Sequence, residues 1–203
     1  QPTANELQKA TDAFDRAEVF DPAAEHAYMG LEEVEALRQP ANWTGHLEFL
    51  TLASMRNPVN PVPHYKIGLY HGRRWRHRVE NEVIPADTDD VTRARIEQEI
   101  EDEFQLASES LTTAIRIEIN FTDALNALGD LYEARANLKT GEERVAERKR
   151  AIKYLERSRN VEADNSAVRI RLSRLYADAG QTAEAMSEIQ ALLAQQPEHT
   201  EAL

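Results

Sequence analysis

The sequence predicts an all-α protein built as an α-solenoid, in which helix-turn-helix hairpins stack and the central unit is enlarged and irregular. Alanine, glutamate, leucine and arginine are abundant, whereas only 7 of 203 residues are glycine, a composition that favours helices. Apolar residues recur three and four positions apart, which is the spacing of one helix face. Similar helical segments return along the chain, and each is too short to bury its apolar face alone.

The C-terminal hairpin shows this pattern most clearly. Asn165 or Ser166 can cap a first helix, Gly180 marks a short turn, and Thr182 can cap a second helix. The first helix carries the apolar stripe Val168, Leu172, Leu175 and Tyr176. Small residues near the turn predict a close approach of the two helices: Ala177, Ala179, Ala183 and Ala185.

Upstream segments repeat parts of this hairpin. A first-helix pattern occurs at Leu128, Gly129 and Tyr132, and less fully at Leu172, Ser173 and Tyr176. A second-helix pattern of small, large and small or apolar residues occurs four times: Ala10, Phe14 and Ala17; Ala107, Leu111 and Ala114; Ala151, Leu155 and Ser158; Ala185, Ile189 and Leu192. Pro22 and Pro197 follow the first and the last copy.

These segments resemble the tetratricopeptide repeat, a helix-turn-helix unit of about 34 residues. Leu128, Gly129 and Tyr132 match the family's Leu-Gly-x-x-Tyr motif, and Gly180 matches its turn glycine. The resemblance implies an α-solenoid whose first helices line a concave groove for an extended peptide or a partner helix.

Two parts of the chain depart from the family spacing. Nineteen positions separate Tyr132 from Ala151, ten more than the family allows, and the extra stretch is charged and favours helix. We therefore expect longer helices or a bigger turn there. In residues 41–90 a helix over Trp43–Met55 is expected, but the following NPVNPVP should break any helix. The next residues, HYKIGLYHG, resemble a first helix of the repeat only weakly. A long helix is predicted from a cap at Asp87 or Thr88 to about Ile119.

The whole chain, 1–203, is predicted to form a single solenoid. Its parts are an N-terminal repeat portion at 1–40, a divergent insert at 41–90 and C-terminal repeats at 91–203. The first helix, about Asn5 to Val19, matches the second half of a repeat, and the residues after Pro197 could only begin another. Both ends of the solenoid are therefore expected to be open and able to stack on another protein or on further repeats.

Composition excludes several classes of function. A formal net charge of −12 disfavours wholesale nucleic-acid binding. The absence of cysteine excludes disulfides and thiolate metal sites, and no H-E-x-x-H or phosphate-loop motif occurs. We predict no catalytic residues, no metal, no cofactor and no transmembrane segment. The sequence does not decide whether the protein lies in the cytoplasm or, after removal of a signal peptide, in the periplasm or outside the cell. A chain that begins at Gln1 is expected to be a processed or excised piece.

Residues 64–78, HYKIGLYHGRRWRHR, contain five Lys or Arg and no acid, so the rest of the chain carries a formal −12 − 5 = −17. One interpretation is a patch for an anionic lipid, a nucleic acid or a partner, made by Lys66, Arg73, Arg74, Trp75, Arg76 and Arg78. The other interpretation is that the segment makes contacts within the protein. The arginines would pair with acids of the following long helix, such as Glu97, Glu99, Glu101 and Asp102, while Trp75 packs inside. We favour the internal or protein-contact interpretation.

The predicted groove wall has mixed charge. Its residues lie about one turn apart on the two first helices: Asn126, Asp130 and Glu133, then Arg171, Arg174 and Asp178. A purely structural alternative is that Asp130 and Arg174 pair with each other. The lysines of the family's terminal-carboxylate clamp are missing, so we do not expect that mode of binding.

The most direct functional reading is a non-enzymatic scaffold or adaptor that holds protein partners in the groove or on the solenoid ends. The alternative is an anion-binding module that acts through residues 64–78 at a membrane surface or on nucleic acid, and a third hypothesis is a regulatory domain of an enzyme. A strong salt dependence of binding, lost when Arg73, Arg74 and Arg76 are replaced by alanine, would favour the anion-binding module.

Overall fold

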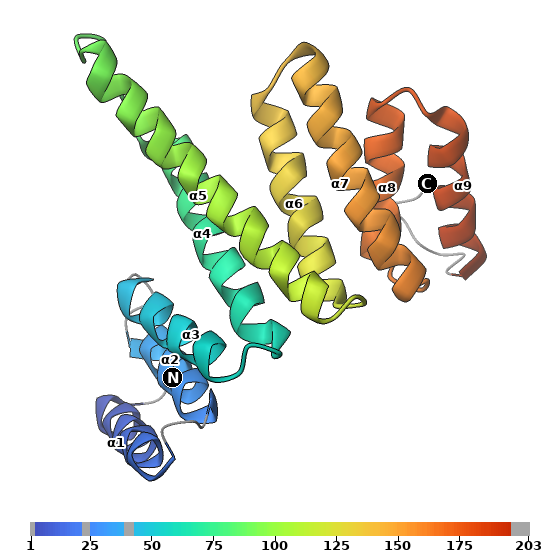
Figure 1. The fold of residues 1–203 in the computed structure, drawn as a ribbon. Helices are drawn as coiled ribbons and strands as arrows, with labels where there is room; N and C mark the ends of the chain where they lie inside the picture. Colours follow the sequence, from blue (N-terminus) through green and yellow to red (C-terminus); the bar gives the residue numbers. More distant parts are fainter. Residues whose placement is uncertain (1–2, 22–24, 39–42, 196–203) are drawn as a thin grey trace. The chain divides into compact units, whose positions relative to one another are not determined.

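Nine helices make up the part of the chain that the computed structural model describes, residues 3–21, 25–38 and 43–195 (Figure 1). No strand occurs in these residues, and the predicted all-α class is confirmed. Contacts between helices divide the chain into two compact units, residues 1–117 and 118–203. The closing prolines Pro22 and Pro197, and the start of another repeat after Pro197, lie outside the described residues.

The first unit opens with three helices that pack in chain order. They are α1 (Ala4–Phe20), α2 (Glu25–Arg38) and α3 (Trp43–Arg56), and α3 also contacts the next helix. Helix α1 begins at a capping box, in which the backbone N–H of Glu6 donates to the Thr3 hydroxyl and the Thr3 N–H donates to the Glu6 carboxylate. Of its three motif residues, Ala10 and Phe14 are half-buried and Ala17 is exposed. The three motif residues of this first copy are therefore more exposed to solvent than those of the later copies.

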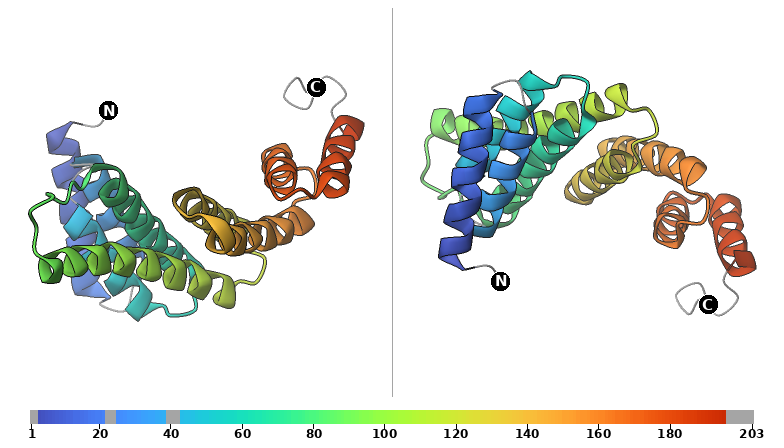
Figure 2. Two further views of the ribbon diagram at one scale, coloured as in Figure 1. Left: turned by 90° about the horizontal axis from the view of Figure 1, so that it is seen from above. Right: turned by 90° about the horizontal axis from the view of Figure 1, so that it is seen from below.

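A long hairpin completes the first unit. Helices α4 (Pro61–Asn81) and α5 (Asp90–Ile117) run side by side in both views of Figure 2. Gly68 of α4 lies against Leu111 of α5, because a Cβ added to the glycine would fall 2.5 Å from the leucine Cγ. The sequence matched α4 to a first helix only weakly, yet this contact places α4 and α5 as the two helices of one repeat. The predicted boundary at residue 90 separates two helices that pack as a pair.

The proline-rich stretch interrupts the helices over fewer residues than the sequence predicts. Residues 57–60 separate α3 from α4, but Pro61 and Pro63 lie in the first turn of α4. A proline there loses no hydrogen bond, because the first N–H groups of a helix have no acceptor within it. Asn60 caps this turn through the Val62 N–H at 2.9 Å. The long helix α5 likewise uses Asp89 as its cap, not Asp87 or Thr88, since the Thr92 N–H donates to the Asp89 carboxylate.

The second unit consists of two hairpins. Helices α6 (Thr122–Leu138) and α7 (Gly141–Val161) form one, and α8 (Ser166–Asp178) and α9 (Thr182–Gln195) form the other. Its core lies between α7, α8 and α9 and, apart from Ile152, is built from residues of the predicted patterns: Ala151, Ile152, Leu155, Val168, Leu172, Leu175, Tyr176 and Ala185. Asn165 caps α8, as predicted, by accepting from the Val168 N–H.

The turn between α8 and α9 is made by Gly180, whose φ of +74° favours glycine. Of the four alanines near this turn, only Ala185 is buried, while Ala177, Ala179 and Ala183 are exposed. The prediction that these alanines bring α8 and α9 together is therefore wrong for three of them. Close packing occurs instead in the preceding hairpin, where a Cβ on Gly129 of α6 would fall 2.7 Å from the side chain of Leu155 on α7.

The extra residues after Tyr132 lengthen the helices. Helix α6 reaches Leu138, only two residues separate it from α7, and α7 has 21 residues against 13 in α8. The expectation of longer helices is confirmed, and the turn stays short. The first turns of α7, before Arg148, therefore extend past the end of α8, because the two helices are antiparallel and Arg148 lies opposite Asp178.

Candidate functional site

The six residues predicted to line the groove lie on α6 and α8: Asn126, Asp130 and Glu133 on the first helix, and Arg171, Arg174 and Asp178 on the second. We call this set the α6–α8 wall. Arg171 contacts the carboxylates of both Asp130 and Glu133, with 2.7 Å between Nη2 and Glu133 Oε2. Arg171 therefore links the two first helices and uses its charge within the wall.

Arg174 stands apart from this network. It is exposed, and it forms no ion pair with any residue that the structure describes. The structural alternative, in which Asp130 and Arg174 pair, is wrong because Arg171 occupies Asp130. Asp178 is held by Arg148 of α7, with Nη2 and Oδ2 3.1 Å apart. Of the two arginines in the wall, Arg174 is thus the one whose charge is available to a partner.

Asn126 contributes a polar atom without a partner. Its side chain is half-buried, and its Oδ1 atom is buried and accepts no hydrogen bond within the described part of the chain. A buried acceptor in this state costs free energy until a donor reaches it.

An apolar hollow borders the wall at Arg174. It lies between α8 and α9, has a volume of about 340 Å³, and includes Ile170, Met186 and Ile189 among its lining residues. We call it the α8–α9 hollow. Met186 is exposed, and Ile170 and Ile189 are half-buried. The hollow places apolar surface beside Arg174, which has no ion-pair partner among the described residues.

The basic segment 64–78 lies on α4, and several of its charges are used within the first unit. Lys66 pairs with Glu32 at 2.5 Å, and Arg78 pairs with Glu82 at 2.5 Å and with Glu99 at 3.0 Å. These carboxylates raise the pKa of the Arg78 guanidinium. The Arg78–Glu99 pair was predicted from the sequence and is confirmed.

The buried side of α4 is held by a second network. Glu103 of α5 accepts from Arg74 at 3.1 Å and contacts the Nδ1 atom of buried His71 at 2.7 Å. Trp75 is only 4% exposed and packs edge-on against Phe104, with ring centroids 5.3 Å apart. The internal packing of Trp75 is confirmed, so its ring is not available to stack on a base.

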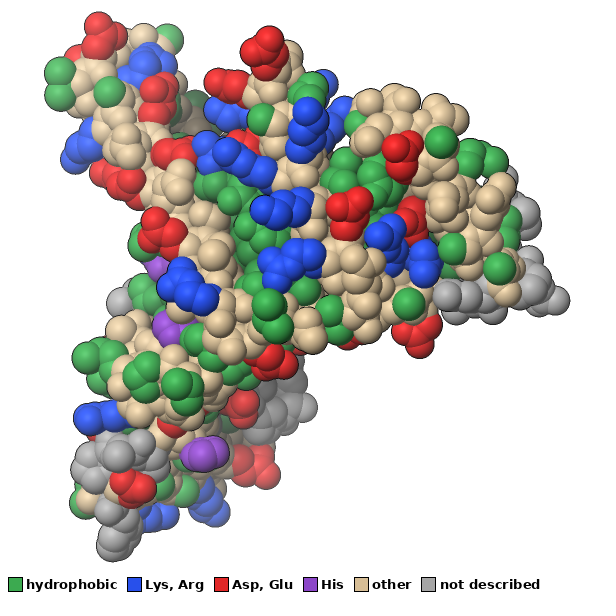
Figure 3. Space-filling model, turned by 45° about the vertical axis from the view of Figure 1, so that its right-hand side comes forward, with side chains coloured by type: hydrophobic (Ala, Val, Ile, Leu, Met, Phe, Trp, Pro, Cys, Tyr) green, Lys and Arg blue, Asp and Glu red, His purple; other side chains and the backbone are tan. Residues whose placement is uncertain are grey.

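Three arginines of this segment, Arg73, Arg74 and Arg76, are exposed. Arg74 nevertheless pairs with Glu103, so at least three of the five Lys and Arg residues of the segment are engaged by carboxylates. Both acidic and basic side chains are visible on the face of the molecule drawn in Figure 3. The structure thus favours the internal interpretation of residues 64–78.

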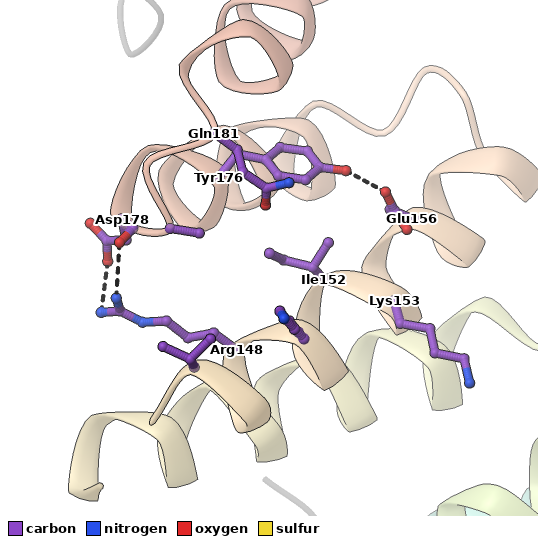
Figure 4. A pocket seen from close by; sticks show the side chains of 10 residues that line it. Arg148, Ile152, Lys153, Glu156, Tyr176, Asp178 and Gln181 are labelled. Atoms are coloured by element: carbon purple, nitrogen blue, oxygen red, sulfur yellow. Dashed lines mark hydrogen bonds and ion pairs between the residues drawn. The ribbon is translucent and has the colours of Figure 1, made fainter. Parts of the chain in front are cut away.

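A second pocket lies between α7 and α8, and the sequence did not indicate it. Its volume is about 360 Å³. Figure 4 shows the ring of Tyr176 and the side chain of Ile152 on opposite sides of the hollow, with Arg148 reaching Asp178 at one end. At the other end the Tyr176 hydroxyl donates to Glu156. Burial, together with Glu156, raises the pKa of Tyr176.

The comparisons with known proteins concern the repeat family and the fold. The model of the family described as "Tetratricopeptide repeat" matches residues 147–203, which span α8, α9 and most of α7. Residues 147–203 thus match the tetratricopeptide repeat family. The resemblance predicted from the motifs is confirmed, and no curated protein matches the chain.

Solved structures extend the tetratricopeptide repeat fold over nearly the whole chain. The structure described as MamA is 15% identical, with a TM-score of 0.63, and the match covers 96% of this chain and 91% of that one. YrrB, described as a TPR protein with an unusual peptide-binding site, is 18% identical with a TM-score of 0.59, covering 98% and 82%. A thermophilic TPR protein of Thermus thermophilus is 18% identical with a TM-score of 0.58, covering 98% and 87%. At these identities the likeness concerns the fold.

The tetratricopeptide repeat fold indicates a protein-interaction scaffold in general terms. Within the described residues, no group of three or more His, Asp or Glu side chains is placed to hold a metal ion. None of the described helices has the length and apolar character needed to cross a bilayer.

Proposed function

We propose that this chain is a non-enzymatic scaffold that holds a protein partner against the α6–α8 wall. The observation that carries the proposal is the position of Arg174. Arg171 is already paired inside the wall, whereas Arg174 is exposed, unpaired among the described residues and next to the α8–α9 hollow. A partner segment with an acidic side chain for Arg174 and an apolar side chain for the hollow would satisfy both features.

Two further features support a binding role for the wall. The Arg171 bridge holds α6 and α8 together before a partner arrives, so less conformational entropy is lost on binding. YrrB, which shares the fold, is described as having a peptide-binding site, and we extend this kind of use to the present chain.

The α8–α9 hollow also suits contact at the end of the solenoid. Its apolar lining would be covered if a further helix, from a partner or from additional repeats, stacked on α8 and α9. A partner that enters the groove and covers this end would use both surfaces at once.

The anion-binding alternative has less support. Lys66, Arg74 and Arg78 are engaged by carboxylates and Trp75 is buried, so few of the predicted contacts are free for a phosphate or a base. A partner that is a lipid or a nucleic acid would leave the chain as salt rises, because such binding depends on counterion release.

Charge reversal at one position tests the proposal. The wild-type chain, an Arg174→Glu variant and an Arg76→Glu variant are each used to isolate binding proteins from the native source at moderate salt. Arg76 is an exposed arginine on α4, so its reversal changes the net charge equally without touching the wall. We expect the wild type and Arg76→Glu to retain the same protein, and Arg174→Glu to lose about nine-tenths of it, as for a lost charged contact of about 1.4 kcal/mol. Retention by Arg174→Glu, or recovery of nucleic acid or lipid alone, would contradict the proposal.

A further inference from the structure

The N-terminal part of α7, which extends past the end of α8, supplies part of the lining of the pocket between these helices. Helix α7 has 21 residues and α8 has 13, and Arg148 lies opposite the last residue of α8, Asp178. Val145 therefore lies beyond the end of α8, where it lines the pocket together with Ala179 of the turn. We call this the α7–α8 pocket, and the residues that depart from the family spacing contribute Val145, Arg148 and Lys149 to it.

The pocket has an apolar floor. Ile152 is almost fully buried, whereas Val145 is 51% exposed at the rim. A volume of about 360 Å³ is at the lower end of the range for ligand pockets, which is roughly 300 to 1,000 Å³. It therefore has room for one or two side chains.

Both ends of the pocket are fixed by polar contacts (Figure 4). Arg148 binds Asp178 twice, through the carboxylate at 3.1 Å and through the backbone carbonyl at 3.2 Å. Tyr176 donates its hydroxyl hydrogen to Glu156. The rim is thus largely arranged before any ligand enters, which reduces the entropic cost of binding.

The charges that remain available at the rim are positive. The lining includes Arg148, Lys149 and Lys153 but only two acids, Glu156 and Asp178. Arg148 and Asp178 satisfy each other, and Glu156 accepts from Tyr176. Lys149 and Lys153 are exposed and form no ion pair with a described residue. This local excess is opposite in sign to the net charge of −12 on the whole chain.

The two lysines lie one helical turn apart on the same side of α7, so a single carboxylate can contact both ammonium groups. In Figure 4 Lys153 extends away from the hollow into solvent. Its four-carbon side chain has several rotatable bonds, so the ammonium can reach a ligand at the rim without movement of the helix.

We propose that the α7–α8 pocket binds a short protein segment in which an acidic side chain contacts Lys149 and Lys153 and an adjacent apolar side chain rests on Ile152. The apolar floor and the cationic rim select this pairing of side chains. A polyphosphate is less suitable, because it has no apolar group to place on Ile152. The pocket shares only Asp178 with the α6–α8 wall, and Asp178 is already paired with Arg148, so this proposal does not rest on the proposed function.

The test is an NMR titration of the ¹⁵N-labelled chain with two defined peptides. One is acetyl-Ser-Glu-Leu-Ser-amide, and the other carries Gln in place of Glu. We expect the first peptide to shift the backbone amides of Lys149, Ile152 and Gln181, and the second to bind at least several-fold more weakly.

A matched pair of double variants isolates the lysines. Lys149→Gln with Lys153→Gln should weaken binding about tenfold, since two partly exposed charged contacts are each worth up to about 1 kcal/mol. Lys9→Gln with Arg76→Gln alters the net charge by the same amount at two exposed sites elsewhere and should leave binding unchanged. The spectra themselves report whether each variant is folded.

Three outcomes would overturn the proposal. They are the absence of shifts around the pocket at the highest peptide concentration, equal binding of the two peptides, and unchanged binding by the variant without Lys149 and Lys153. Shifts confined to the α6–α8 wall would overturn the pocket and leave the proposed function standing. Pocket shifts that survive Arg174→Glu would support the pocket independently of the wall.

Discussion

Leu155 occupies space that Gly129 leaves open on the facing helix. Leu155 is fully buried, and a Cβ at position 129 would fall 2.7 Å from both its Cγ and its Cδ2 atoms. Real Cβ atoms essentially never approach this closely, and a buried side chain in a close-packed core has little room to move. The glycine thus sets how closely α6 and α7 approach.

Gly129→Ala should destabilise the second unit by about 1 to 2 kcal/mol. Overpacking a core costs roughly 1 to 3 kcal/mol, and the better helix propensity of alanine returns up to about 1 kcal/mol. The measurement is the urea midpoint of unfolding, with an unchanged slope.

A double-mutant cycle with Leu155→Ala separates overpacking from other effects. Leu155→Ala alone leaves a cavity, which the added methyl group at position 129 partly fills. The double variant should therefore be more stable than the sum of the single changes implies. A Gly129→Ala variant as stable as the wild type would show that the two helices can separate without cost.

The sequence predicted those residues whose positions follow a fixed spacing within one helix. Gly129, Leu155 and Ser158 follow a fixed motif, and the structure buries all three. The partner of Asp130 was not predictable in the same way. Whether Arg171 or Arg174 reaches it depends on the rotation of α8 relative to α6, which no spacing within one helix encodes.

At the scale of helices, Glu188 of α9 ties together three elements. It is 5% exposed and contacts Arg159 of α7 and Arg169 of α8, the latter at 2.7 Å. A buried carboxylate is tolerated here because two guanidinium groups surround it. The two hairpins of the second unit are therefore joined by charge as well as by apolar packing.

Glu188→Gln should lower the free energy of unfolding by about 3 kcal/mol. This is the lower end of the range for a broken buried ion pair, because Arg159 and Arg169 keep some contact with solvent. Chemical unfolding measures the change. Glu184→Gln, an exposed position on the same helix, is the control and should change stability by less than about 0.5 kcal/mol. Equal effects of the two variants would contradict a structural role for the Glu188 network.

Most helices could be predicted from the sequence, and the predictions that were incomplete have physical causes. Helix α4 was matched weakly because NPVNPVP suggests a break, although Pro61 and Pro63 are compatible with the first turn of a helix. The extra charged stretch predicted a longer helix, and α7 confirms it. The pocket beside α7 could not be predicted, because it depends on where the shorter α8 ends.

For the molecule as a whole, the central claim is that a tetratricopeptide repeat fold is used here to bind protein through the α6–α8 wall. The repeat pattern made the fold predictable, because each hairpin must bury its apolar face against its neighbours in the same way. It did not specify the partner, because binding residues lie on the solvent side of each helix, where packing places little constraint on side chains.

The most direct measurement is site-specific photo-crosslinking in cells that make the protein. A photoreactive amino acid is placed at Ala177, which is exposed on α8 one turn after Arg174, and separately at Gln190, which is exposed on α9. We predict one defined protein linked through position 177, at several times the yield obtained from position 190. Equal yields at both positions, or a protein linked only through position 190, would contradict the wall as the binding surface.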